Sequence, residues 1–256
     1  KFTGGNRPGP IVQLLDNVFT GSSDDVLELL GTDAHIEGNL FLRVHQDAVR
    51  NDAAHAIATG RNGGETSEVT VVRNLFADCD HALLLQDGAS AVFQHNTVVA
   101  IRTNAPAAEV PSAISLGAQH SALPSGARAD LDGNIFWNLD GNRLVSGLTS
   151  NTVFNVQRSI VPGTNWPGQG NLNLDPRFVN SAGIGDYRTL RQALGLRPGS
   201  PALHPGPNGL DMGALVPAGV SLAGEPDSPT PLTSAIITAG GPGTEMFYWE
   251  LANEWG

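Results

Sequence analysis

The residues best suited to chemistry are acidic side chains that stand beside histidines and arginines in turns of the sequence. They precede short segments that end in glycine, and they are Asp24 and Asp25, Asp52 and His55, Asp78, Asp80 and His81, and Asp140 and Arg143. If these turns stack, their carboxylates lie about 5 to 10 Å apart. Carboxylates that close repel one another unless a cation or a basic side chain neutralises them.

Two kinds of binding site fit a row of stacked turns that carries these acidic residues. Calcium is satisfied by several oxygens in loose geometry, and its expected ligands are Asp24, Asp25, Asp78 and Asp80. A sugar-binding cleft would instead use Asp52, His55, His81 and Arg143. The third interpretation needs no ligand, because aspartate is common in turns, where it hydrogen-bonds to the nearby backbone.

In a second group of candidates, two polar residues stand two positions apart, which directs both side chains of an extended segment to the same face. His35 with Glu37 and Asp130 with Asp132 show this spacing. The two pairs lie three repeats apart, about 14 Å at 4.8 Å per repeat. That separation exceeds the roughly 9.5 Å limit for paired glycosidase carboxylates. The candidates that remain for catalysis are Arg143, Asp140, His35 and Glu37.

Known routes to polysaccharide cleavage find little support in the sequence. Lys1 is the only lysine, so the base of a lyase would have to be Arg50, Arg102 or Arg143. The G-x-S-x-G pattern of a serine nucleophile is absent. Cys79 stands between two aspartates, which raise rather than lower the pKa of its thiol. We therefore expect no catalysis, with a calcium-assisted polysaccharide lyase or a glycoside hydrolase as the alternative.

The elements that must position these residues form a repeat. An asparagine with apolar residues three positions before it and two positions after it recurs at spacings of 22, 35, 22 and 38 residues, in Asn17, Asn39, Asn74, Asn96 and Asn134. Ser159 takes its place in a degenerate sixth copy. Units this short hold strands but no long helix, and they bury an apolar face only by stacking. We expect an all-β, right-handed parallel β-helix, a single-stranded solenoid; a β-sandwich with antiparallel hairpins is the alternative.

In that stack, the residues three positions before the asparagine should line the interior. They are Leu14, Ile36, Val71, Phe93, Leu131 and Val156. Extra residues in a solenoid repeat map to loops. Loops should therefore project after Arg43, Ile101 and Leu116.

Composition excludes several classes of protein. The 256 residues carry 14 basic and 25 acidic side chains, a net charge of −11, without the clustered Lys and Arg that bind nucleic acid. No apolar run approaches the roughly 18 residues of a membrane-spanning helix. A single cysteine excludes an internal disulfide. The first residues, KFTGGNRPGP, do not have the apolar region of a signal peptide.

Three stretches carry a resemblance to a known family: residues 23–45, residues 67–88 and the closing LDPRFVN and LRPGSPALHPGPNGLDMGALVP. They resemble bacterial right-handed parallel β-helix regions of the pectate-lyase-like type. The likeness is greatest to those of large exported surface proteins that also carry CotH-kinase-like, lamin-tail-like and Ig-like modules. The resemblance implies that Asp175, Pro176, Phe178 and residues 198–202 and 211–214 close the C-terminal end of the helix.

The expected organisation has three parts. Residues 1–216 form the β-helix with its C-terminal cap, residues 217–234 a Pro/Ser-rich linker, and residues 235–256 a hairpin of a truncated Ig-like or fibronectin-like module. By resemblance, the chain is a monomeric module of a longer protein at the cell surface or outside the cell. Its expected function is that of a rigid spacer or a face that binds polysaccharide or a cell-surface glycan, without insertion into a membrane.

Overall fold

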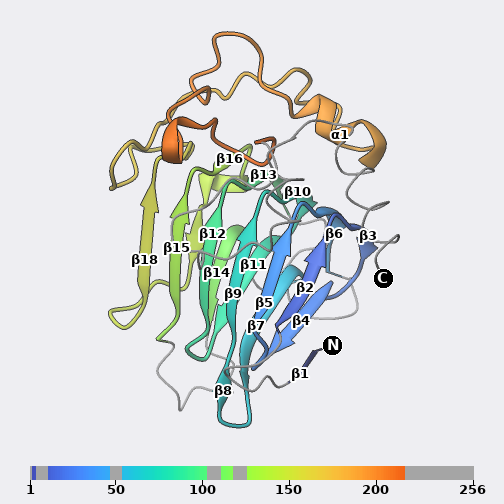
Figure 1. Cartoon of the computed structure of the whole chain (residues 1–256), viewed down its shortest axis with the longest axis vertical. Coiled ribbons are helices and arrows are strands. Elements are labelled where there is room, and N and C mark those ends of the chain that lie inside the picture. Colours follow the sequence, from blue (N-terminus) through green and yellow to red (C-terminus); the bar gives the residue numbers. More distant parts are fainter. Residues whose placement is uncertain (1, 4–10, 47–53, 103–110, 118–125, 217–256) are drawn as a thin grey trace, which may run out of the picture. The chain divides into compact units, whose positions relative to one another are not determined.

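The structure, a computed structural model, describes residues 2–3, 11–46, 54–102, 111–117 and 126–216. Apart from Val216, these residues lie in one compact unit, Lys1–Leu215. Almost all regular structure is β-strand, in three sheets whose neighbouring strands run parallel, with one antiparallel hairpin (Figure 1). The all-β prediction is therefore confirmed. The linker and hairpin predicted for residues 217–256 lie outside the described residues.

The chain enters the three sheets in turn, so that each repeat gives one strand to each sheet. Sheet A contains, in spatial order, β1 (Phe2–Thr3), β4 (Leu27–Leu30), β7 (His55–Asn62), β11 (His81–Gln86), β14 (Ser112–Gly117) and β17 (Val145–Ser146), with β8 (Glu65–Thr66) paired antiparallel to β7. Sheet B contains β2 (Val12–Leu15), β5 (Ala34–Glu37), β9 (Glu68–Val72), β12 (Ser90–Gln94), β15 (Arg128–Asp132) and β18 (Val153–Gln157). Sheet C contains β3 (Val18–Ser22), β6 (Leu40–Val44), β10 (Leu75–Cys79), β13 (Thr97–Ile101) and β16 (Ile135–Trp137).

The predicted interior row is confirmed residue by residue. In sheet B, Ile36 pairs with Leu14 on one side and with Val71 on the other, and Leu131 pairs with Phe93 and Val156. The other five members of the row, Ile36, Val71, Phe93, Leu131 and Val156, are buried in one apolar cluster, and Leu14 packs against that cluster. Because parallel pairing links the successive repeats, the antiparallel sandwich is excluded.

The repeated asparagines form a hydrogen-bonded ladder at the turn from sheet B to sheet C. In each step, a side-chain oxygen accepts the backbone N–H of the preceding asparagine, at 2.8 to 2.9 Å. Ser159 Oγ does the same for Asn134 at 3.0 Å. The ladder continues to Asn171, which accepts from the Ser159 N–H at 3.1 Å and which the repeat did not predict. These amides satisfy the backbone groups that the turn leaves without a strand partner.

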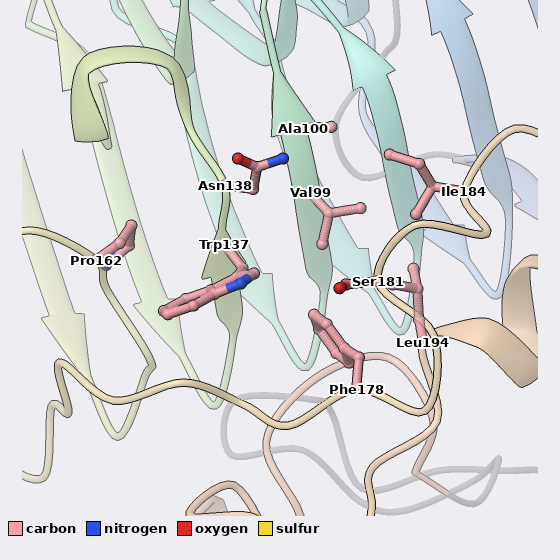
Figure 2. A pocket seen from close by; sticks show the side chains of 9 residues that line it. All are labelled: Val99, Ala100, Trp137, Asn138, Pro162, Phe178, Ser181, Ile184 and Leu194. Atoms are coloured by element: carbon pink, nitrogen blue, oxygen red, sulfur yellow. The ribbon is translucent and has the colours of Figure 1, made fainter.

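A second apolar cluster lies on the outer face of sheet C. Leu40, Leu42, Leu75, Val99 and Ile135 pack there against residues of the segment that follows the strands, which are Phe178, Leu190, Leu194, Ala202, Met212 and Ala214. Figure 2 shows three members of this cluster, Val99, Phe178 and Leu194. This segment contains α1 (Tyr187–Ala193), which Asp186 caps through the Arg188 N–H at 3.0 Å, and the short η2 (Pro207–Gly209).

The predicted closing elements lie against the outer face of sheet C. Phe178, Ala202 and Met212 share an apolar cluster with Val99 of β13 and Ile135 of β16, which is the last strand of that sheet. Arg191 reaches back to the carbonyl of Gly38, at 2.6 Å. The closing segment thus covers the row of apolar residues that sheet C turns outward, which would otherwise be exposed to water.

At the C-terminal end, Trp166 packs against the interior cluster and meets Phe154 of β18 edge to face, with ring centroids 5.9 Å apart. The loops predicted after Arg43, Ile101 and Leu116 fall on residues 47–53, 103–110 and 118–125, outside the described residues. No helix in the described part of the chain has the length and apolar character needed to cross a bilayer.

Candidate functional site

His45 lies between two carboxylates just after β6. Its Nδ1 is 2.9 Å from Asp80 Oδ1 and its Nε2 is 3.0 Å from Asp78 Oδ1, which also accepts from Arg102 Nε at 2.7 Å. Burial disfavours charge on His45, but the hydrogen bonds and charges of Asp78 and Asp80 outweigh it and raise the pKa of His45 to about 9. The hydrogen bond from His45, aided by Arg102, lowers the pKa of Asp78. At pH 7 the cluster is therefore a set of ion pairs.

His55 and His81 stack at paired positions of β7 and β11, with ring centroids 4.8 Å apart. His55 Nδ1 is 2.9 Å from Asp25 Oδ1, and His81 Nδ1 is 3.0 Å from the carbonyl oxygen of Ser112. Burial and the neighbouring His55 lower the pKa of His81 to about 3, so it is neutral at pH 7. The two residues are only 6% and 1% exposed, so a polymer in solvent reaches neither ring without local rearrangement.

The predicted substrate-binding residues partly come together. Ser112 pairs with His81, and the N–H of Ala113 beside it donates to the Arg143 carbonyl at 3.2 Å, which brings the backbone of Arg143 to the starts of these strands. Arg143 follows the 3-10 turn η1 (Asp140–Asn142), and its N–H donates to the Asp140 carbonyl at 3.3 Å. Asp52 lies outside the described residues.

Each of the four predicted calcium ligands has a hydrogen-bond partner within the chain. Asp24 accepts the N–H of Asp25 at 3.0 Å, as a turn-capping aspartate does, while Asp25 pairs with His55. Asp78 and Asp80 share His45. Within the described residues, no group of three or more His, Cys, Asp and Glu side chains is arranged to hold a metal ion. Calcium binding stays a prediction for experiments in solution.

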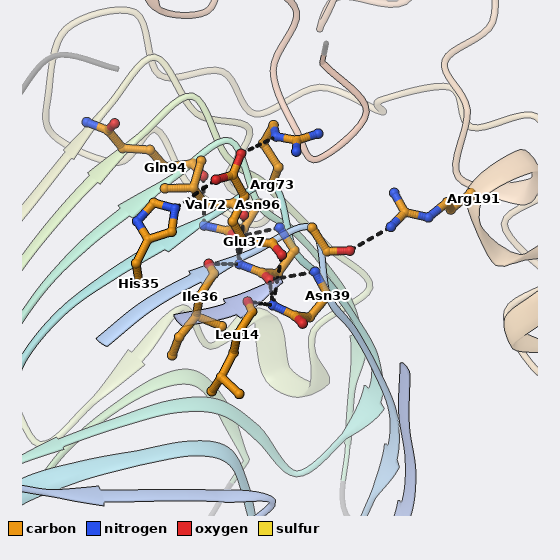
Figure 3. A network of polar contacts seen from close by, with 12 residues as sticks. Leu14, His35, Ile36, Glu37, Asn39, Val72, Arg73, Gln94, Asn96 and Arg191 are labelled. Atoms are coloured by element: carbon orange, nitrogen blue, oxygen red, sulfur yellow. Dashed lines mark hydrogen bonds and ion pairs between the residues drawn. The ribbon is translucent and has the colours of Figure 1, made fainter. Parts of the chain in front are cut away.

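His35 and Glu37 form an ion-paired group on the outer face of sheet B (Figure 3). His35 Nε2 is 2.7 Å from Glu37 Oε2, and Arg73 Nε donates to Glu37 Oε1 at 2.9 Å. Burial opposes the charge of Glu37, but His35 and Arg73 together lower the pKa of its carboxyl. Glu37 is thus ionised at neutral pH and does not serve as a general acid there.

The second outward pair, Asp130 and Asp132, is also held by arginines. Asp130 accepts from Arg128 Nε at 2.7 Å, and Asp132 accepts from Arg158 Nε at 2.9 Å. The strand order of sheet B puts this pair three strands from His35 and Glu37, as predicted. The two pairs do not share one reacting bond.

Cys79 is fully buried at the end of β10. Burial, with the charges of Asp78 and Asp80, raises the pKa of its thiol to about 12. This agrees with the sequence-based interpretation of an unreactive thiol.

The site that sequence reasoning missed is a half-open cavity of about 430 Å³ on the outer face of sheet C. Val99 and Trp137 from the strands face Phe178, Ser181 and other residues of the following segment, and Asn138 lies at one end (Figure 2). Trp137 is half-buried, while Asn138 and Ser181 are exposed. The cavity therefore combines an aromatic ring with neutral hydrogen-bonding groups at its mouth.

Alignment of the repeats could have found part of both sites. His45, Asp80 and Arg102 all stand six positions after their asparagines. Trp137 and Val99 stand three positions after theirs, in the outward row of sheet C. Sequence reasoning named Asp80 as a turn acid and Arg102 as a possible base, but it aligned only the rows before the asparagine and so missed His45 and the cavity.

Comparisons with models of known families, with curated proteins and with solved structures found no match to this chain. A function for the chain therefore has to be inferred from its geometry.

Proposed function

We propose that the three sheets are the three faces of a right-handed parallel β-helix. The turn-by-turn entry of the chain into sheets B, C and A, and the unbroken asparagine ladder, support this arrangement. Right-handed connection is the strong preference for strands that return parallel to the same sheet. The closed solenoid would give the molecule the stiffness that a spacer needs.

On this scaffold, the function that we propose is carbohydrate binding without catalysis, in an exported surface protein. The observation that carries the binding role is the cavity with Trp137 in its wall. Sites for small molecules are concave, mostly apolar and lined by a few placed polar groups. An indole offers a flat apolar surface for the C–H face of a sugar ring, and Asn138 and Ser181 can bond to its hydroxyls. The exported location rests on the family resemblance alone.

The enzyme alternative has less support. Abstraction of a proton by arginine requires a site that lowers the pKa of its guanidinium. Hydrogen bonding and charge from Asp78 instead raise the pKa of Arg102. His55 and His81 are buried, and Glu37 is already ion-paired. We therefore favour a binding module over a lyase or hydrolase.

The test is glycan binding by the intact chain, measured on a glycan array and by saturation-transfer NMR. Trp137→Ala should weaken binding about two- to thirteen-fold, since an aromatic contact contributes about 0.5 to 1.5 kcal/mol. Trp137→Phe should retain most of the affinity.

Trp166→Ala is the matched control, because Trp166 packs at the end of the stack and does not line the cavity. It should lower stability without changing affinity. Equal affinity in Trp137→Ala and the unaltered chain would refute a role for the cavity.

A further inference from the structure

We infer that the Trp137 cavity selects short, uncharged sugars, one or two rings long, and rejects uronates. This inference rests on the proposed carbohydrate-binding function and adds the class of ligand. It concerns a different set of glycans from the acidic polymers that a lyase would cleave.

The charge of the cavity wall favours neutral ligands. The residues that line it are Val99, Ala100, Trp137, Asn138, Pro162, Phe178, Ser181, Ile184 and Leu194, and none of them ionises. A carboxylate placed among these side chains would lose water without gaining a cationic partner, which is costly. The net charge of −11 adds long-range repulsion of anions.

The size of the cavity limits the length of the ligand. At the packing density of a protein interior, a pyranose of twelve heavy atoms occupies roughly 200 Å³. The volume of about 430 Å³ therefore accommodates one or two rings. Further rings would lie in solvent and add little to affinity.

The polar groups of the cavity are placed to meet sugar hydroxyls. Asn138 directly follows Trp137 and has a left-handed backbone, with φ of 53°. Its amide and the Ser181 hydroxyl both line the cavity, Asn138 beside Trp137 and Ser181 on the segment that forms the other wall (Figure 2). Amides and hydroxyls both donate and accept hydrogen bonds, which suits sugar hydroxyls and gives no preference to a carboxylate.

The experiment uses matched sugars that differ only at C6. The methyl glycosides of glucose, galactose and mannose are compared with the methyl glycosides of the corresponding uronic acids, which carry a free carboxylate at C6. Neutral di-, tri- and hexasaccharides are compared next. Binding is measured by calorimetry and saturation-transfer NMR on the full chain. The best neutral sugar should bind at least about ten-fold more tightly than its uronate. Affinity should stop rising at the disaccharide.

A charge-introducing variant checks the cause of this selectivity. Ser181→Lys should strengthen uronate binding about five-fold through a new attraction at the mouth, and Ser181→Ala should not. Ser181 is exposed, so both variants should fold.

The outcomes distinguish failure of the inference from failure of the proposed function. A uronate that binds as well as its neutral partner, or affinity that rises steadily to the hexasaccharide, overturns the inference but leaves carbohydrate binding in place. Binding of no sugar of either kind refutes the proposed function itself.

Discussion

Replacement of Asn74 tests the ladder that holds successive repeats in register. The Asn74 side chain is fully buried and accepts from the backbone N–H and the side-chain amide of Asn39, at 2.9 and 3.0 Å. It donates to the carbonyls of Ile36 and Val72, at 2.8 and 2.9 Å, and to Asn96 Oδ1 at 3.1 Å. Asn74→Ala removes these bonds and leaves the buried N–H of Asn39 without its acceptor. An orphaned buried group costs about 1 to 3 kcal/mol and each lost bond about 1 kcal/mol, so we expect a loss of about 3 to 5 kcal/mol.

The assay is urea unfolding, with Asn17→Ala as the control. Asn17 stands at the exposed start of the ladder, where water can replace its bonds to Leu15 and Asn39, so its loss should cost less than about 1 kcal/mol. Asn74→Ser should fall between the two, because Ser159 shows that a hydroxyl can accept the N–H of the preceding asparagine. If Asn74→Ala does not fold, Asn74→Ser supplies the measurement. A cost no larger for Asn74→Ala or Asn74→Ser than for Asn17→Ala would refute the reasoning.

Three further predictions concern charge and chemistry. The pKa of His45 is raised from its usual 6.5 to about 9, so its ion pairs contribute their full stability to the folded chain below pH 6.5 and lose it as pH rises through 9. The temperature of unfolding should therefore fall between pH 6 and pH 10, and His45→Gln should remove this pH dependence. If the turn acids bind calcium, its addition should stabilise the chain by about 2.7 kcal/mol at 100 times the dissociation constant. Chelation, Asp25→Asn or Asp80→Asn should abolish that gain, and no shift at millimolar calcium leaves only turn capping. We expect no unsaturated product from pectate, alginate or glycosaminoglycan; ultraviolet absorbance that appears with the native chain and vanishes in Arg102→Ala or Arg143→Ala would promote the lyase alternative.

The phase of the repeated asparagines is sufficient to predict the interior of the fold. A residue that must sit at a fixed turn sets the phase of every strand beside it, because side chains alternate in and out along a strand. The sequence alone therefore places Ile36, Val71 and Phe93 inside. The pairing found in sheet B follows that phase without a slip.

The partners of the acidic residues are less predictable. The sequence groups the turn acids one repeat at a time, whereas His45 reaches Asp78 and Asp80 across a gap of 33 and 35 residues. Asn171 was not predicted because its distance from Ser159 in the sequence is too short, not too long. It comes 12 residues after Ser159, too soon for a full repeat, yet its amide takes the same place in the ladder.

The cavity could not be predicted because only one of its two walls belongs to the repeat. Val99 and Trp137 lie in repeated strands, while Phe178 and Leu194 belong to a segment with no repeat that is held to sheet C by apolar packing. That segment also bonds to the turns of the stack, where Gly213 N–H meets the Gly133 carbonyl at 2.7 Å and Ala214 N–H meets Thr97 Oγ1 at 2.9 Å. A ligand in the cavity would touch both walls, so binding and the attachment of the segment stabilise each other.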